Sequence, residues 1–127
     1  MHDNQDDNFV ERRRFPRYAV HYLAKVYLKD EMLFGTVINI SEGGVGIMLP
    51  NIIPAGTVLT LGIRSILPEE AKEEAIKEIN LKARIIWIKE EIIDGMYRGG
   101  LEIIDISEED LEILIAHIQY LDEQTDQ

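Results

Sequence analysis

The sequence predicts a mainly β domain in which about six short strands are followed by one C-terminal helix. Between residues 18 and 106, apolar residues recur at every second position in short runs, and turn-forming residues separate the runs. That pattern is typical of strands with one buried face. After residue 107 the apolar spacing becomes that of a helix. Regularly spaced short strands joined by tight turns favour an antiparallel barrel or a sandwich.

The first strand is the clearest of the series. From Tyr18 to Lys29 the alternating apolar positions are Val20, Tyr22, Ala24, Val26 and Leu28. The other predicted strands cover residues 32–40, 45–49, 57–66, 81–89 and 96–106. Asp30-Glu31 and Asp94-Gly95 mark turns, and the second pair is a strong hairpin dipeptide. Between Asn39 and Gly46, the glycines permit the left-handed backbone of a tight turn.

Residues 67–80 allow two interpretations. A short helix over Glu69–Ile79 is favoured by its helix-forming residues and by Pro68, which suits a first helical turn. An elongated loop that runs into the next strand fits equally well.

The last predicted element is a helix over residues 107–121, followed by a polar tail over 122–127. Ser107 and Asp110 have the spacing of a capping box, with Asp in place of the usual Glu or Gln. One apolar face follows at helical spacing, formed by Leu111, Leu114, Ile115, Ile118 and Leu121.

Composition and charge narrow the function classes. The 127 residues suit a single domain, and the net charge is −11. Such acidity disfavours nucleic-acid polymers and anionic membranes as partners. The sequence has no signal peptide, no membrane-spanning apolar run and no cysteine, so we expect a cytoplasmic protein without membrane insertion.

Catalytic and metal-binding patterns are absent from the sequence. There is no cysteine nucleophile, and His2, His21 and His117 stand far apart, without metal-ligand spacing. We therefore expect a protein that is not an enzyme and that has no metal or cofactor. An unrelated small β-barrel enzyme or carbohydrate-binding domain is the alternative, with no residue pattern in its favour.

An arginine cluster contrasts with this acidic chain. Arg12, Arg13, Arg14 and Arg17 are four of the thirteen basic residues. Pro16 favours extended geometry, so the cluster is predicted to form an arm over residues 11–18. Guanidinium groups pair with phosphate and stack on flat rings. From the cluster alone, a solvated arm that pairs with the acidic body is the favoured interpretation.

A second motif changes the interpretation of the arginine cluster. Arg12-Arg13-x-x-x-Arg17, followed by Asn39-x-Ser41-x-x-Gly44, resembles the two-part signature of PilZ domains, R-R-x-x-x-R and [D/N]-x-S-x-x-G. The strand with Trp87, the segment Gly99–Ile103 and the C-terminal helix also resemble the family, over residues 11–120.

The resemblance implies a six-stranded antiparallel β-barrel with a C-terminal helix. The domain organisation would be a flexible tail over 1–10 and a PilZ domain over 11–121. Within that domain, the arm 11–18 precedes the barrel 18–106 and the helix 107–121.

The resemblance also implies a receptor for the bacterial second messenger cyclic di-GMP. The ligand set carried over to this sequence is Arg12, Arg13, Arg17, Asn39, Ser41 and Gly44. Arginines would pair with phosphate and with the guanine O6/N7 edge. Asn39 and Ser41 would meet a guanine edge, and Gly44 would keep the backbone close to the ligand. One ligand or an intercalated pair would bind, and Arg12 could serve the second molecule. Apart from the resemblance, Trp87 is expected to pack in the barrel core or against the C-terminal helix.

The family usually transmits the signal by ordering its N-terminal arm when the ligand binds. This would change a surface for a protein partner acting in trans, or for a homodimer, in the control of motility, pili, biofilm or exopolysaccharide. The alternative within the same fold is an interaction module of motility or pilus machinery that does not bind nucleotide. Such modules typically lack the arginines that are present here.

Overall fold

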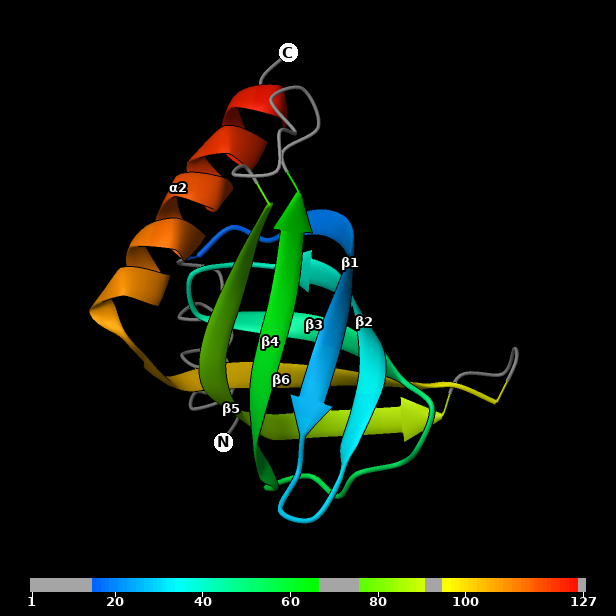
Figure 1. The fold of residues 1–127 in the computed structure, drawn as a ribbon. Coiled ribbons are helices and arrows are strands. Elements are labelled where there is room, and N and C mark those ends of the chain that lie inside the picture. The colour runs from blue at the N-terminus through cyan, green and yellow to red at the C-terminus, as the bar shows by residue number, and fades with distance from the viewer. Residues whose placement is uncertain (1–14, 67–75, 91–94, 126–127) are drawn as a thin grey trace, which may run out of the picture.

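The computed structural model describes residues 15–66, 76–90 and 95–125, and it contains a closed barrel with one helix beside it (Figure 1). The expected tail over residues 1–10 and the first part of the arm lie outside the described residues. The elements are β1 (Tyr18–Tyr27), β2 (Met32–Ile40), β3 (Gly44–Leu49), β4 (Val58–Ile66), β5 (Ile76–Glu90), β6 (Tyr97–Ile106) and α2 (Glu108–Thr125).

The six strands pair antiparallel in the order β1-β2-β3-β6-β5-β4, and β4 pairs with β1 to close the barrel. The predicted fold class, a mainly β six-stranded antiparallel barrel with a C-terminal helix, is confirmed. Alternate residues of each strand point inward, as the period of two requires. The core consists of Ala24, Val26, Val37, Ile40, Val45, Ile47, Leu49, Ile53, Leu59, Leu61, Ile63, Ile79, Leu81, Ala83, Ile85, Leu101, Leu114 and Ile118.

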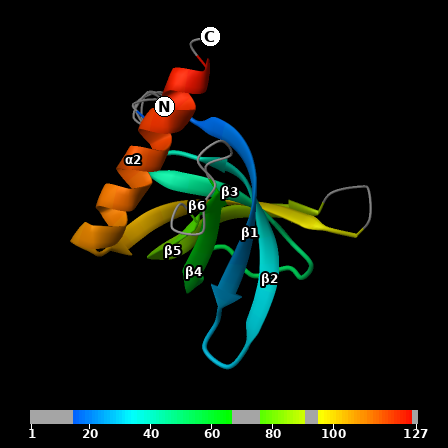
Figure 2. The ribbon, with the colours of Figure 1, turned by 45° about the horizontal axis from the view of Figure 1, so that its top comes forward.

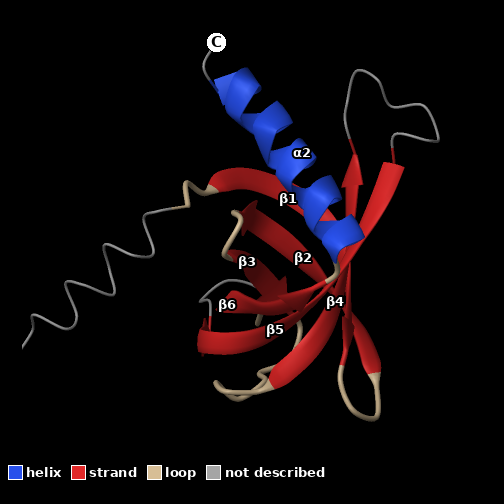
Figure 3. Cartoon of the chain, turned by 90° about the vertical axis from the view of Figure 1, so that its left-hand side faces the viewer, coloured by secondary structure: helices blue, strands red, loops and turns tan. Residues whose placement is uncertain are grey.

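The helix lies against one side of the barrel. The ladder between β1 and β4 joins Ala24–Tyr27 to Thr60–Ile63, which leaves the first half of β1 beyond that ladder. Helix α2 contacts β5 and β1, beside the start of β1 (Figures 2 and 3). Leu114 and Ile118 enter the core from this side.

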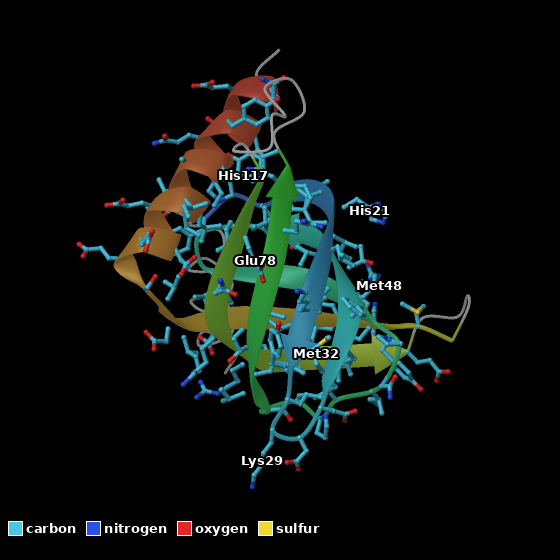
Figure 4. All side chains as sticks on the ribbon, in the orientation of Figure 1. His21, Lys29, Met32, Met48, Glu78 and His117 are labelled. Carbon is cyan, nitrogen blue, oxygen red and sulfur yellow. The ribbon has the colours of Figure 1, made fainter. Side chains whose placement is uncertain are left out.

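Two side-chain hydrogen bonds also tie α2 to β1. The Tyr22 hydroxyl lies 2.5 Å from Nε2 of buried His117, and the Tyr18 hydroxyl donates to Asp122 Oδ1 at 2.7 Å. Figure 4 shows His117 between the helix and the barrel. Burial lowers the pKa of His117 and raises that of Tyr22. The helix is therefore fixed to the strand that continues from the arginine arm.

The start of α2 is as predicted, but its end is not. The Asp110 N–H donates to Ser107 Oγ at 3.0 Å, which is the capping bond, and Asp110 Oδ1 accepts from the backbone N–H of Asn80. The helix continues to Thr125, so residues 122–125 belong to it and not to the predicted polar tail. The apolar stripe ends at Leu121, but Asp122 continues the contact with β1 through Tyr18.

The structure decides part of the open segment over residues 67–80. Strand β5 begins at Ile76 and pairs with β4 from there, so the helix interpretation fails at residues 76–79, and the strand expected from Leu81 starts earlier. Ile79 and Leu81 are both buried, as alternate residues of a strand are. Packing of these side chains in the core decides the structure here against the local helix propensity. The remainder of that segment, 67–75, lies outside the described residues. Among the described glycines, positive φ occurs at Gly56 (94°) and Gly95 (62°). The glycines between Asn39 and Gly46 therefore do not use the left-handed backbone that glycine permits, whereas Gly95 supports the predicted turn before β6.

No helix among the described residues is long and apolar enough to cross a membrane.

Candidate functional site

The turn between β2 and β3 is built around the side chain of Ser41. Its Oγ accepts the N–H groups of Gly43 at 3.2 Å and Gly44 at 3.1 Å, and donates to the Gly44 carbonyl at 3.2 Å. The Ser41 N–H donates to the same carbonyl at 2.9 Å. Ser41 is only 3% exposed. Its hydroxyl therefore holds the turn closed without a left-handed glycine, and this accounts for serine at this position before any ligand is considered.

A row of glycines forms the floor of the site across β3 and β6. Residues facing each other on neighbouring strands point to the same side of the sheet. Gly46 of β3 faces Asn39 of β2 on one side and Gly100 of β6 on the other, and Gly100 in turn faces Trp87 of β5. A Cβ on Gly46 would lie 2.5–2.9 Å from the Asn39 amide group, and one on Gly100 would overlap the Trp87 indole. The glycines thus allow Asn39 and Trp87 to lie flat over the strands.

Gly44 is required for a related reason. A Cβ there would collide with the carbonyl oxygen of Leu101 on β6. The family resemblance implies that Gly44 makes room for a ligand, but contact with the neighbouring strand already excludes a side chain.

Arg17 connects the end of the arm to β2. Its Nη1 donates to Asn39 Oδ1 at 2.9 Å, across 22 positions of sequence. The two halves of the predicted motif therefore meet in space at this bond. Arg12 and Arg13, the other predicted ligand arginines, lie outside the described residues.

An open cavity of about 340 Å³ lies over this floor. The predicted site residues that line it are Arg17, Ser41 and Gly44. Asn39 is not part of the lining, but its side chain accepts the hydrogen bond from Arg17. The complete lining is Phe15, Arg17, Ser41, Gly43, Gly44, Ile86, Trp87, Gly100, Leu101 and Glu102.

Sequence reasoning missed five side chains of this cavity, which are Phe15, Ile86, Trp87, Leu101 and Glu102. Phe15 lies against Gly43, where an added Cβ would be 3.0 Å from the ring. Trp87 is 41% exposed, so the expectation that it packs in the core or against the helix is wrong. The register of β5 against β6 shifts between Ile85 and Trp87, and such a bulge turns two consecutive residues, Ile86 and Trp87, outward. Gly99-Gly100 opposite the tryptophan signals room for a large side chain over β6, but it does not locate the bulge in β5.

The charged groups around the cavity are of both signs. Arg17 of the lining is exposed, and Glu102 of the lining pairs with Arg84 of β5 at 3.5 Å. Both partners of this pair are about half exposed, so it contributes at most about 1 kcal/mol to stability. No group of three or more His, Asp or Glu side chains within the described ranges is arranged to hold a metal ion. The cavity offers guanidinium and aromatic groups over a glycine floor, which suits an anionic ligand with flat rings, and it also contains one carboxylate.

Comparison with known proteins agrees with this geometry. The family model for the PilZ domain matches residues 11–120. The chain belongs to the PilZ domain family. No curated protein matches it closely enough to serve as a relative.

Solved structures of PilZ proteins have the same fold. The inhibitor of motility MotI/DgrA from Bacillus subtilis is similar at 23% identity with a TM-score of 0.71, over 91% of this chain and 52% of its own. The PilZ domain of YcgR from Escherichia coli, solved with c-di-GMP, has 21% identity and a TM-score of 0.65, with 90% and 94% covered. The MrkH–c-di-GMP complex from K. pneumonia has 16% identity and a TM-score of 0.67, with 90% and 54% covered. This chain therefore spans about half the length of MotI and MrkH.

Proposed function

We propose that this PilZ domain is a cyclic di-GMP receptor that binds its ligand in the cavity between Arg17 and Trp87. The observation that carries the proposal is the Arg17–Asn39 hydrogen bond. It joins the arginine arm to the second motif at the edge of a glycine-floored cavity. The structures of YcgR and MrkH with c-di-GMP support this choice of ligand.

The chemistry of the lining matches a cyclic dinucleotide. Its two phosphodiester groups require cations, which Arg17 supplies, and Arg12 and Arg13 are proposed to add to it. Its bases require flat apolar surfaces, which Phe15 and Trp87 supply at the cavity mouth. The cavity volume of about 340 Å³ lies in the usual range for small-molecule sites. On a chain of net charge −11, the arm provides the local positive field that a dianion needs.

Signal transmission is proposed to run from the arm into β1 and α2. Arg17 directly precedes Tyr18, which is bonded to Asp122 of the helix, and Tyr22 is bonded to His117. Ordering of the arm around the ligand would then change the surface formed by the arm and the helix. A protein partner acting in trans, or a second copy of this chain, would recognise that surface. The involvement of motility, pili, biofilm or exopolysaccharide, the cytoplasmic location and the lack of enzymatic activity stay predictions.

Titration calorimetry with cyclic di-GMP tests the proposal and gives the stoichiometry, one ligand or an intercalated pair. Arg17→Ala removes a charge-assisted contact, so the Kd should rise about 10- to 100-fold. Arg64→Ala is the matched control, because Arg64 is exposed on β4, outside the cavity lining, and this variant should bind like the parent. Absence of binding to the parent, or parental affinity of Arg17→Ala, would refute the proposal. Absence of binding would favour the nucleotide-independent interaction module.

A further inference from the structure

Glu102 is an unexpected residue at the edge of an anion-binding cavity. It lies on β6 between Gly44 of β3 and Arg84 of β5, and it is one of the residues that line the cavity. A carboxylate repels phosphate at short range. If the cavity held only phosphate groups, an acidic side chain here would weaken binding, so its presence calls for a ligand group that donates hydrogen bonds.

The other described side chains of the site leave few acceptors for such a group. Arg17 and the indole of Trp87 only donate. The Asn39 Oδ1 already accepts from Arg17, and the Ser41 hydroxyl is buried within its turn. The Glu102 carboxylate is the one strong side-chain acceptor in the described lining, with two oxygens and a side chain that is half exposed.

Guanine and adenine differ in the feature that such an acceptor detects. The Watson–Crick edge of guanine presents two adjacent donors, the N1–H and the 2-amino group. The same edge of adenine presents one donor beside an acceptor, and its N1 would face a carboxylate oxygen without a proton between them. A carboxylate accepts two parallel N–H groups bidentately, as it does from arginine.

We propose that Glu102 is a specificity-determining residue that accepts the N1–H and 2-amino groups of one guanine and thereby selects guanine over adenine. Arg84 is a positioning residue: its guanidinium lies 3.5 Å from the carboxylate and offsets its charge. Gly44, directly across the ladder from Glu102, has no side chain that could cover the carboxylate or pair with it. This inference rests on the proposed function and adds the base selectivity of the same site.

The test compares Glu102→Gln with the parent by titration calorimetry against cyclic di-GMP, cyclic di-AMP and cyclic di-IMP, whose base lacks the 2-amino group. The parent should bind cyclic di-GMP most tightly of the three. In the variant, affinity for cyclic di-GMP should fall about 10- to 100-fold, since a lost bidentate base contact has about that effect. The amide of Gln pairs with the adenine edge, so affinity for cyclic di-AMP should hold or rise.

The control variant is Glu112→Gln, which makes the same charge change at an exposed position of α2 and should bind all three ligands like the parent. An equal rise in affinity for all three ligands in Glu102→Gln would mean that the carboxylate acts only as a charge, and would overturn the inference. An unchanged ratio of the three affinities would overturn it too. Both results leave the receptor function intact, whereas a parent that does not bind cyclic di-GMP overturns both proposals.

Discussion

The substitution Ser41→Ala separates a structural role of the signature serine from a direct role in ligand binding. Ser41 belongs to the motif that the family resemblance links to the ligand, yet its hydroxyl makes three hydrogen bonds inside the β2–β3 turn. Alanine retains the backbone and removes only Oγ. We therefore expect the variant to lose stability first.

The size of the loss follows from the environment of the hydroxyl. Ser41 is 3% exposed, so water cannot readily replace Oγ as the acceptor for the Gly44 N–H. Each lost hydrogen bond costs about 1 kcal/mol, and a buried donor left without a partner costs about 1–3 kcal/mol. The free energy of unfolding should fall by about 2–3 kcal/mol. At this chain length that lowers Tm by roughly 10 °C.

The assay pairs thermal unfolding by circular dichroism with calorimetric binding of cyclic di-GMP at about 10 °C, where the variant remains folded. Glu42→Ala is the control, because Glu42 is the exposed neighbour in the same turn and should leave Tm unchanged. Ser41→Ala should show the lower Tm and keep binding within about fivefold. A parental Tm combined with lost binding would refute the reasoning, because the hydroxyl would then serve the ligand and not the turn.

Two predictions concern the attachment of α2. Burial holds the pKa of His117 below its ordinary 6.5, so the neutral ring contributes fully to stability above pH 6.5, and this contribution is lost as the pH falls towards the lowered folded-state pKa. Urea unfolding at pH 7.5 and 5.5 should therefore show a smaller change in the free energy of unfolding for His117→Gln than for the parent. An equal change in the two proteins would contradict this. Ser107→Ala removes the helix cap and should cost about 1 kcal/mol, whereas Ser107→Asn retains a capping acceptor and should cost less; urea midpoints check this, and equal losses in the two variants would count against the capping role.

Much of the fold could be predicted because each strand shows its buried face in the sequence. Alternation located β1 to β4 and β6 within one or two residues, and the Ser107 cap located the start of α2. Residues 76–79 stayed open between helix and loop because propensity is local, whereas their pairing with Ile63–Ile66 is a tertiary contact. The end of α2 was missed for the same reason, since Tyr18 is 104 residues away from Asp122.

The site was predictable only on the side that the motifs cover. Arg17, Asn39, Ser41 and Gly44 stand at a spacing that two adjacent strands bring together, although the reasons for Ser41 and Gly44 are internal contacts. The opposite wall depends on how β5 and β6 are aligned. One extra residue at Ile86 turns Trp87 outward and sets the alignment beyond it, and no pattern along the chain states where a bulge falls.

The Tyr18–Asp122 hydrogen bond has a practical consequence for biosensor design. The two ends of the described chain lie side by side although 104 residues separate the bonded pair in sequence. A donor fluorophore attached just before β1 and an acceptor attached after α2 would therefore begin within efficient energy-transfer range. Any ligand-driven displacement of the arm would appear as a change in emission ratio, and neither a labelled partner nor an identified downstream pathway would be needed.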